Sequence, residues 1–205
     1  MSKPKTSEHM SKINLKGSNL PPLQSLIVLH FAKSKPQTIN ETVTELSESY
    51  GRKKNYKPNR SAFNSLEKKK IICKTGVKEY RGREYPRFWL TVEGIITAIL
   101  EGAERSVLIE KGKMVFSDAK VHCFLEVVEH MNPAVLYLAR KVVKDKEELD
   151  FIDIMSLLVS DAMFETDVET MKKTFAGLKK YPEWYEQGKM IIEQIIEQLQ
   201  QLISD

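Results

Sequence analysis

Apolar residues in the first fifty positions recur at the spacing of two amphipathic helices. The first pattern begins after a pair of prolines and predicts a helix over Pro22–Lys33. After the break at Ser34 to Gln37, Val43 and Leu46 predict a shorter second helix, with Asn40 as its N-cap. Each of these two helices has an apolar face that must pack against another part of the protein.

A third helix is predicted from Arg60 to Lys69, with Phe63 and Leu66 on its inward face. Its start is open, because either Asn59 or the Lys57-Pro58 pair could begin it. The segment before it is rich in lysine and arginine and contains no acid, which indicates a basic turn.

A β-hairpin and a fourth helix are predicted to follow. The β-branched run Ile71–Thr75 and the aromatic run Tyr85–Leu90 favour strands, and Gly76–Gly82 is predicted as the charged turn between them. Thr91 is the expected N-cap of the next helix, whose first turn contains Glu93 and Gly94.

Beyond Gly102 the chain is predicted to be helical, with Gly112 and Pro133 among the breaks. The five predicted helices are Asp118–Met131, Pro133–Lys144, Phe151–Phe164, Val168–Lys180 and Pro182–Ser204. The fold class is therefore mostly α. We expect a basic disordered tail at 1–19, a winged-helix domain at 20–101 and a helical dimerisation or sensing domain at 102–205.

Charge divides between the two halves of the 205-residue chain. Residues 1–101 contain 19 Lys and Arg against 9 Asp and Glu, whereas 102–205 contain 13 against 19. A basic half suggests contact with a polyanion, although solvated lysine-rich surfaces are also common. No apolar run is long enough for a membrane span, and the polar N-terminus lacks the apolar core of a secretory signal, so a cytoplasmic, nucleoid-associated location is expected.

The stretch from Phe63 to Gly94 resembles bacterial and archaeal regulators of the PadR and MarR types. In these families the recognition helix ends in a Leu-rich motif followed by glycine and two apolar residues, and the second wing strand runs into Leu-Thr-x-x-Gly. The resemblance covers about residues 20–101 and implies a winged helix-turn-helix. Lys70 stands where the families usually have glycine, and the Gly-Tyr pair of PadR proteins is absent from the second helix.

A winged helix of this kind would bind double-stranded DNA, with the third helix in the major groove. On its outer face, Arg60 could contact guanine and Asn64 adenine, while the wing would contact phosphates or the minor groove. The predicted DNA-binding residues are Arg52, Lys53, Lys54, Lys57, Asn59, Arg60, Ser61, Asn64, Lys68, Lys78, Arg81 and Arg83. They could also be ordinary solvated side chains.

The last predicted helix is the best candidate for a homodimer contact, because its apolar residues alternate at spacings of three and four. The predicted interface residues are Ile191, Ile192, Ile195, Leu199 and Leu202. The same stripe could instead pack within its own domain, since it is wider than a two-stranded seam requires.

Enzymatic chemistry has little support in the sequence. His122, Glu126 and His130 share one helix face, but no further His or Cys in the second half could complete a metal site. No phosphate-binding loop or nucleophile motif is present, so we expect no catalytic residues, no metal and no cofactor. The leading hypothesis is a homodimeric transcriptional regulator with an unidentified small-molecule or protein effector. The alternatives are a winged-helix protein-interaction scaffold and a helical enzyme that carries a DNA-binding appendage.

Overall fold

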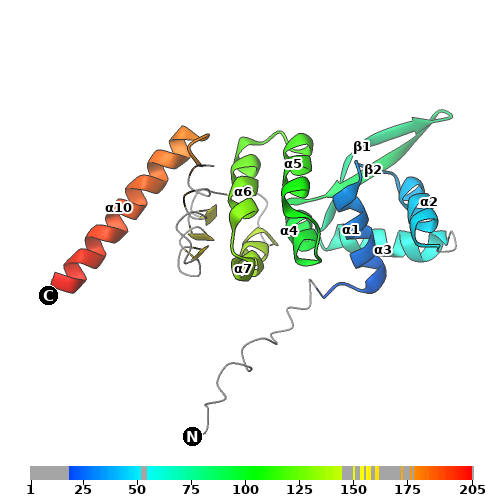
Figure 1. Cartoon of the computed structure of the whole chain (residues 1–205). Helices are drawn as coiled ribbons and strands as arrows, with labels where there is room; N and C mark the ends of the chain where they lie inside the picture. The colour runs from blue at the N-terminus through cyan, green and yellow to red at the C-terminus, as the bar shows by residue number, and fades with distance from the viewer. Residues whose placement is uncertain are drawn as a thin grey trace, which may run out of the picture.

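The computed structural model describes residues 19–51, 55–144 and 178–204, together with 150, 153–154, 156–157, 160–161, 172 and 176. The fold is mostly α, as expected: three helices are followed by a two-stranded antiparallel hairpin and then by a helical region (Figure 1). This order is consistent with a winged helix. The predicted tail and most of the predicted helices Phe151–Phe164 and Val168–Lys180 lie outside the described residues.

The first three helices pack around a shared aromatic core. They are α1 (Pro22–Lys33), α2 (Ile39–Tyr50) and α3 (Tyr56–Lys68), and α1 has the bounds that its apolar spacing predicts. The rings of Phe31 in α1 and Phe63 in α3 meet edge to face at 5.8 Å between centroids. Both side chains are fully buried, so the aromatic contact holds α3 against α1.

The start of α2 differs from the prediction, because Thr38 and not Asn40 is the N-cap. The Thr38 hydroxyl accepts a hydrogen bond from the Glu41 N–H, and the Glu41 carboxylate accepts one from the Thr38 N–H at 2.8 Å. This reciprocal capping box satisfies two backbone donors, which a cap at Asn40 would leave without partners. The helix ends at Gly51, whose φ of 61° is left-handed.

The third helix begins one turn earlier than Arg60, at Tyr56, with Asn55 at the N-cap position. Pro58 therefore lies within its first turn. Proline is tolerated there because the N–H groups of the first turn have no acceptor within the helix.

The wing is longer than predicted and its turn is shorter. Its strands are β1 (Ile72–Tyr80) and β2 (Arg83–Leu90), joined by Arg81 and Gly82 alone. Both turn residues have positive φ, 52° and 69°, as a two-residue hairpin turn that matches the strand twist requires. Gly76, predicted to open the turn, instead lies within β1 beside a shift in register.

An isolated β-bridge attaches the segment between α1 and α2 to the hairpin. Gln37 and Phe88 exchange two backbone hydrogen bonds, of 3.1 and 2.7 Å. Trp89, next along β2, is fully buried, and its indole N–H donates to the Phe31 carbonyl at 3.1 Å. The base of the wing is thereby fixed to the end of α1.

The helix α4 (Val92–Leu100) begins as predicted, because the Thr91 hydroxyl accepts a hydrogen bond from the Gly94 N–H at 3.0 Å. Gly94 allows a close approach of backbones: a Cβ atom at this position would lie 2.0 Å from the Ile71 carbonyl oxygen. Any larger residue would force α4 away from the end of α3.

The helical region contains an element that the sequence analysis missed. Its helices among the described residues are α5 (Arg105–Val115), α6 (Ala119–His130), α7 (Pro133–Lys144) and α10 (Pro182–Ser204), and α5 is the one of these four that was not predicted. Gly112, interpreted as a break, lies inside α5, where a Cβ would come within 2.9 Å of the Ile95 and Leu125 side chains. The glycine permits close helix packing and does not end the helix.

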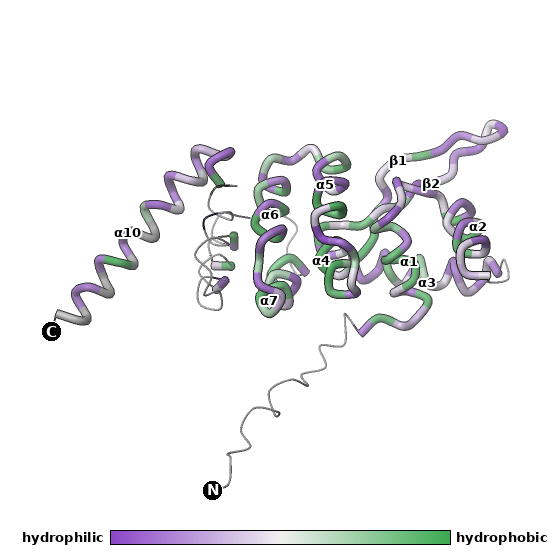
Figure 2. The backbone as a smooth tube through the Cα atoms, viewed as in Figure 1, coloured by the Kyte–Doolittle hydropathy of each residue, from purple (hydrophilic) through white to green (hydrophobic). Residues whose placement is uncertain are grey.

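One hydrophobic cluster runs from the winged helix into the helical region. It includes Phe31 and Trp89 on one side of residue 101 and Leu108, Phe124 and Leu136 on the other. Figure 2 shows hydrophobic segments throughout α4 to α7, whereas the hairpin tip is hydrophilic. Among the described residues, no helix combines the length and the apolar character that crossing a membrane requires.

The end of α3 gives the first testable prediction. Lys70 has a φ of 56°, and the Ile71 and Lys70 N–H groups donate to the carbonyls of Leu66 and Glu67, which is a Schellman motif. The left-handed conformation costs a non-glycine residue about 1–2 kcal/mol. Lys70→Gly should therefore raise the free energy of unfolding. The expected increase is about 0.5–1 kcal/mol, because the greater conformational freedom of glycine in the unfolded chain offsets part of the gain.

Urea unfolding would measure this change, and Lys68→Gly is the matched control. Lys68 is exposed and lies within α3, so glycine should destabilise the protein there. Equal destabilisation by the two variants would contradict the role assigned to Lys70.

Candidate nucleic-acid interface

The outer face of α3 carries five of the twelve predicted DNA-contacting side chains. Ala62, Phe63 and Leu66 are buried against the core, which leaves the opposite face in solvent. The exposed residues on this face are Lys57, Arg60, Ser61, Asn64 and Lys68. None of these five side chains makes a hydrogen bond or ion pair with another described residue, so all are free to bind a partner.

Asn59 differs from its neighbours. Its side-chain N–H donates to the Asn55 carbonyl at 2.7 Å, and the residue is half-buried. The side chain therefore supports the first turn of α3. Its predicted contact with DNA remains a prediction that would require this bond to break.

The far end of α3 is tied to α1 by a chain of polar contacts. The Gln24 side-chain N–H donates to the Ser65 hydroxyl at 3.0 Å, and the Gln24 carbonyl accepts from the Lys69 ammonium at 3.0 Å. Gln24 is buried, so these bonds replace the water that its amide loses. They fix the rotation of α3 and hence the face that it presents.

The hairpin tip presents two arginines to solvent. Arg81 and Arg83 are both exposed, and the Arg81 guanidinium lies 5.2 Å from the centre of the Tyr80 ring. This cation–π contact restricts the arginine without neutralising its charge. The tip and the start of α3 lie at the same end of the molecule, and α10 lies at the opposite end (Figure 1).

Lys78, also predicted to contact DNA, is engaged within the protein. Its ammonium forms a close ion pair with Glu41 of the α2 capping box. Burial would raise the pKa of the Glu41 carboxyl, but hydrogen bonds from Lys78 and Thr38, with the lysine charge, hold the pKa below its usual value of 4.5. The pair connects the wing to α2 and sets the angle at which the tip projects.

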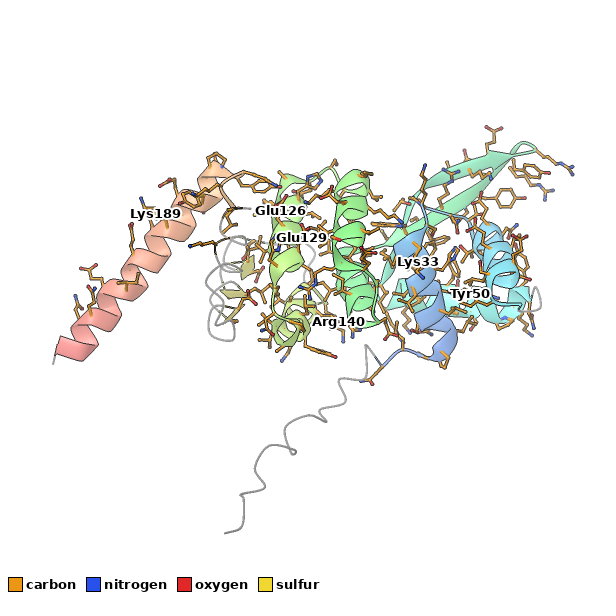
Figure 3. All side chains as sticks on the ribbon, viewed as in Figure 1. Lys33, Tyr50, Glu126, Glu129, Arg140 and Lys189 are labelled. Atoms are coloured by element: carbon orange, nitrogen blue, oxygen red, sulfur yellow. The ribbon has the colours of Figure 1, made fainter. Side chains whose placement is uncertain are left out.

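Exposed tyrosines stand at the end of α2, the start of α3 and the end of β1, and the sequence analysis did not assign them a role. Tyr50, Tyr56 and Tyr80 are 49%, 46% and 56% exposed. Figure 3 shows Tyr50 at the same end of the molecule as the hairpin tip, far from Lys189 of α10. Burial and then the neighbouring Tyr85 raise the pKa of Tyr56. The sequence does contain a signal for such a role, because Tyr50 and Tyr56 lie among the lysines and arginines of one segment.

Several predicted residues cannot be placed at this interface. Arg52, Lys53 and Lys54 lie outside the described residues, between α2 and α3.

The proposed dimer residues belong to α10, but their side chains lie outside the described part; they are Ile191, Ile192, Ile195, Leu199 and Leu202. Among the described apolar side chains of α10, Met190 and Ile196 are 59% and 48% exposed.

The histidine-bearing face of α6 is occupied by structural contacts. The His122 Nε2 atom is 2.6 Å from the Phe116 carbonyl oxygen, and Glu126 binds the ammonium groups of Lys113 and Lys180, each at 2.9 Å. Burial would raise the pKa of Glu126, but the two lysines lower it. Among the described residues, no group of three or more His, Cys, Asp or Glu side chains could hold a metal ion.

Comparisons with models of known protein families, with curated proteins and with solved structures find no match for this chain.

The Glu41–Lys78 pair predicts a pH-dependent stability. Because the folded pKa of Glu41 is lowered, its contribution is complete above pH 4.5 and is lost as the pH falls through the folded pKa. Glu41→Ala should reduce the free energy of unfolding by about 1 kcal/mol near neutral pH, since it removes the capping box and the ion pair.

Thermal or urea unfolding across the acid range would measure the effect. The difference between Glu41→Ala and the parent protein should narrow with acidification. Glu48→Ala, at an exposed position of the same helix, is the control and should change stability little. If the difference in free energy of unfolding between Glu41→Ala and the parent protein stayed constant with pH, this result would contradict the ion pair.

Proposed function

We propose that the protein is a sequence-specific DNA-binding transcriptional regulator that acts as a homodimer. The observation that carries the proposal is the exposed, unpaired set of Arg60, Asn64 and neighbouring basic residues on α3, which shares one end of the molecule with Arg81 and Arg83. An α-helix with such side chains fits a major groove, and a basic hairpin beside it can follow the phosphates. The alternatives are a protein-interaction scaffold and a helical enzyme with a DNA-binding appendage.

The resemblance to PadR-type and MarR-type regulators supports the proposal at two positions. Lys70 occupies the place of the family glycine and adopts the left-handed conformation that glycine favours. Gly94, which ends the Leu-Thr-x-x-Gly motif, stands where a side chain would collide with the Ile71 carbonyl. Both residues therefore satisfy the backbone requirements of the motif.

A salt titration with duplex DNA tests the proposal. With about five to eight phosphates neutralised, the logarithm of the binding constant should fall with the logarithm of salt concentration at a slope of roughly −5 to −7. Fluorescence anisotropy with the full chain gives this slope. Absence of binding at low salt would leave the protein-interaction scaffold as the better hypothesis, and genomic footprinting would identify the target sites.

Substitutions should separate base recognition from phosphate binding. Arg60→Ala and Asn64→Ala should each reduce the preference for the cognate site by about 1–3 kcal/mol, because both side chains would contact base edges. Arg83→Ala should weaken all sequences alike, since the wing would contact the backbone. Lys141→Ala, on the exposed side of α7, is the control. If the α3 variants kept the same ratio of affinities for the cognate site and for unrelated DNA, this result would show that another element contacts the bases.

Dimerisation through α10 follows from the small footprint of a single winged helix, which discriminates poorly among the sites of a genome. Ile195→Glu with Leu199→Glu should convert the dimer to a monomer, because two charges would enter the apolar stripe. Light scattering measures the mass, and Gln187→Glu with Gln194→Glu, at exposed positions of the same helix, supplies the control. A dimer that survives the first pair with its fold intact would place the interface elsewhere.

A further inference from the structure

A hollow of about 280 Å³ lies between the wing and the start of α2. Three residues of the wing and three from the start of α2 line it: Lys78, Tyr80, Tyr85, Thr38, Asn40 and Glu41. Sites for drug-sized ligands usually have volumes of about 300–1,000 Å³. The hollow is slightly smaller than this range and suits a single planar ring.

The two faces of the wing differ in charge. Residues that are directly opposed in an antiparallel pair share a face, so Tyr80 and its partner Arg83 lie on the face that lines the hollow. On the other face Glu79 opposes Glu84, and both are exposed. A polyanion is therefore attracted to the face with the hollow and repelled by the opposite face.

Two aromatic side chains line the hollow. Tyr80 is 56% exposed and Tyr85 is half-buried. Every nucleobase has a flat π surface that can stack on such a ring, whatever its sequence. Arg81 lies 5.2 Å from the centre of the Tyr80 ring, and Arg83 is directly opposite Tyr80 in the hairpin. Both arginines are therefore close enough to bind the phosphates on either side of a stacked base.

The polar groups of the hollow leave one side chain for the edge of a base. The Glu41 carboxylate is occupied by Lys78 and Thr38, and its pairing with Lys78 joins α2 to the wing. The Asn40 side chain is exposed and forms no hydrogen bond with another described residue. Its amide offers both donors and an acceptor, which match the edge of a nucleobase.

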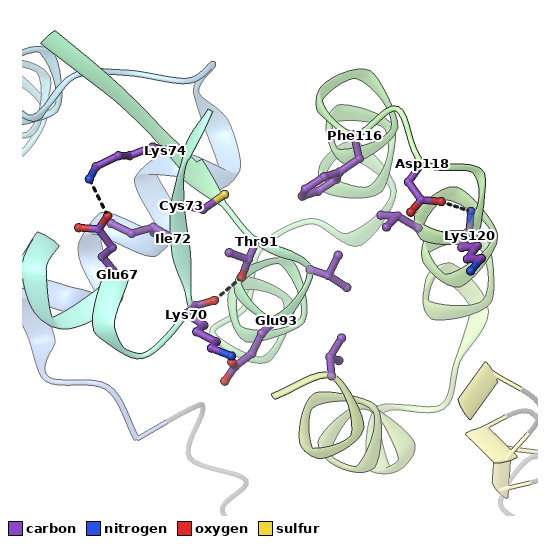
Figure 4. A pocket seen from close by; sticks show the side chains of 13 residues that line it. Glu67, Lys70, Ile72, Cys73, Lys74, Thr91, Glu93, Phe116, Asp118 and Lys120 are labelled. Carbon is purple, nitrogen blue, oxygen red and sulfur yellow. Dashed lines mark hydrogen bonds and ion pairs between the residues drawn. The ribbon is translucent and has the colours of Figure 1, made fainter. Parts of the chain in front are cut away.

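A larger cleft, at the end of α3, has a different lining (Figure 4). Its volume is about 640 Å³, and its one aromatic ring is that of Phe116. Polar contacts already occupy part of this lining, because Glu67 pairs with Lys74 and the Thr91 hydroxyl donates to the Lys70 carbonyl. Of these two sites, the hollow beside α2 offers the greater stacking surface.

We propose that this hollow binds one unpaired base of single-stranded DNA. The base stacks on Tyr80, the Asn40 amide contacts its edge, and Arg81 and Arg83 hold the flanking phosphates. A paired base would first have to leave its duplex, at a cost in stacking and pairing that an unpaired base avoids. This binding goes beyond the proposed function, because it requires no recognition of a duplex sequence.

Fluorescence anisotropy with the full chain and a short labelled oligothymidine tests the binding. The matched probe has the same length and an abasic site at every position, so it keeps the phosphates and removes the bases. Oligothymidine should bind about five- to hundredfold more tightly, because stacking contributes to its affinity alone. Equal affinities for the two probes would overturn the proposal.

Thymidine monophosphate distinguishes a DNA strand from a free nucleotide. It should bind at least about tenfold more weakly than oligothymidine, because it lacks the flanking phosphates. An equal affinity would assign the hollow to a free nucleotide and contradict the binding of a strand.

Substitutions locate the site. Tyr80→Ala should weaken oligothymidine about fivefold and leave the abasic probe unchanged, whereas Tyr80→Phe keeps the ring and should keep the affinity. Tyr50→Ala is the matched control, because Tyr50 is 49% exposed but does not line the hollow. If Tyr80→Ala left the affinity for oligothymidine unchanged, or weakened both probes alike, the base would not stack on Tyr80 and the assignment would be wrong.

The same measurements separate this site from the proposed function. Preferential binding of oligothymidine by a protein that fails to bind duplex DNA would support the hollow and contradict the proposed function. Duplex binding without any preference for oligothymidine over the abasic probe would contradict the hollow alone.

Discussion

The backbone carbonyl of Ile71 is the point at which α3, the wing and α4 meet. Its oxygen accepts hydrogen bonds from the Thr91 N–H at 3.0 Å and from the Thr91 hydroxyl at 3.2 Å. The Ile71 N–H closes the end of α3, and Gly94 leaves space for the carbonyl against α4. Three elements therefore share one short segment, and a shift of any one of them would break hydrogen bonds in the others.

Local sequence signals predicted the elements that depend on local physics. The apolar spacing of Pro22–Lys33 and the cap at Thr91 were both confirmed. The wrong cap at Asn40 arose because several residues there can cap a helix, and only the pairing of Thr38 with Glu41 decides among them. Helix α5 was missed because Gly112 serves a contact with Ile95 and Leu125 that is distant in sequence.

The candidate interface shows the same division between local and distant information. The outward direction of Arg60 and Asn64 follows from the inward direction of Phe63 and Leu66, which the sequence contains. The engagement of Lys78 with Glu41, 37 positions away, depends on how the wing packs against α2. Periodicity predicts which face of an element is polar, but only tertiary structure decides which charges on that face are already paired.

The continuous core constrains how the winged helix could respond to the helical region. Lys111 of α5 donates hydrogen bonds to the Ala32 and Lys33 carbonyls at the end of α1, and burial lowers the pKa of its ammonium. The last carbonyl groups of a helix receive no hydrogen bond from an N–H group of the same helix. Lys111 therefore both caps α1 and attaches it to α5. Because densely packed interiors deform little, a displacement of α5 would be transmitted to α1 and, through the Phe31–Phe63 contact, to α3. The rigidity that fixes the exposed face of α3 is thus the same property that would allow a distant event to move it.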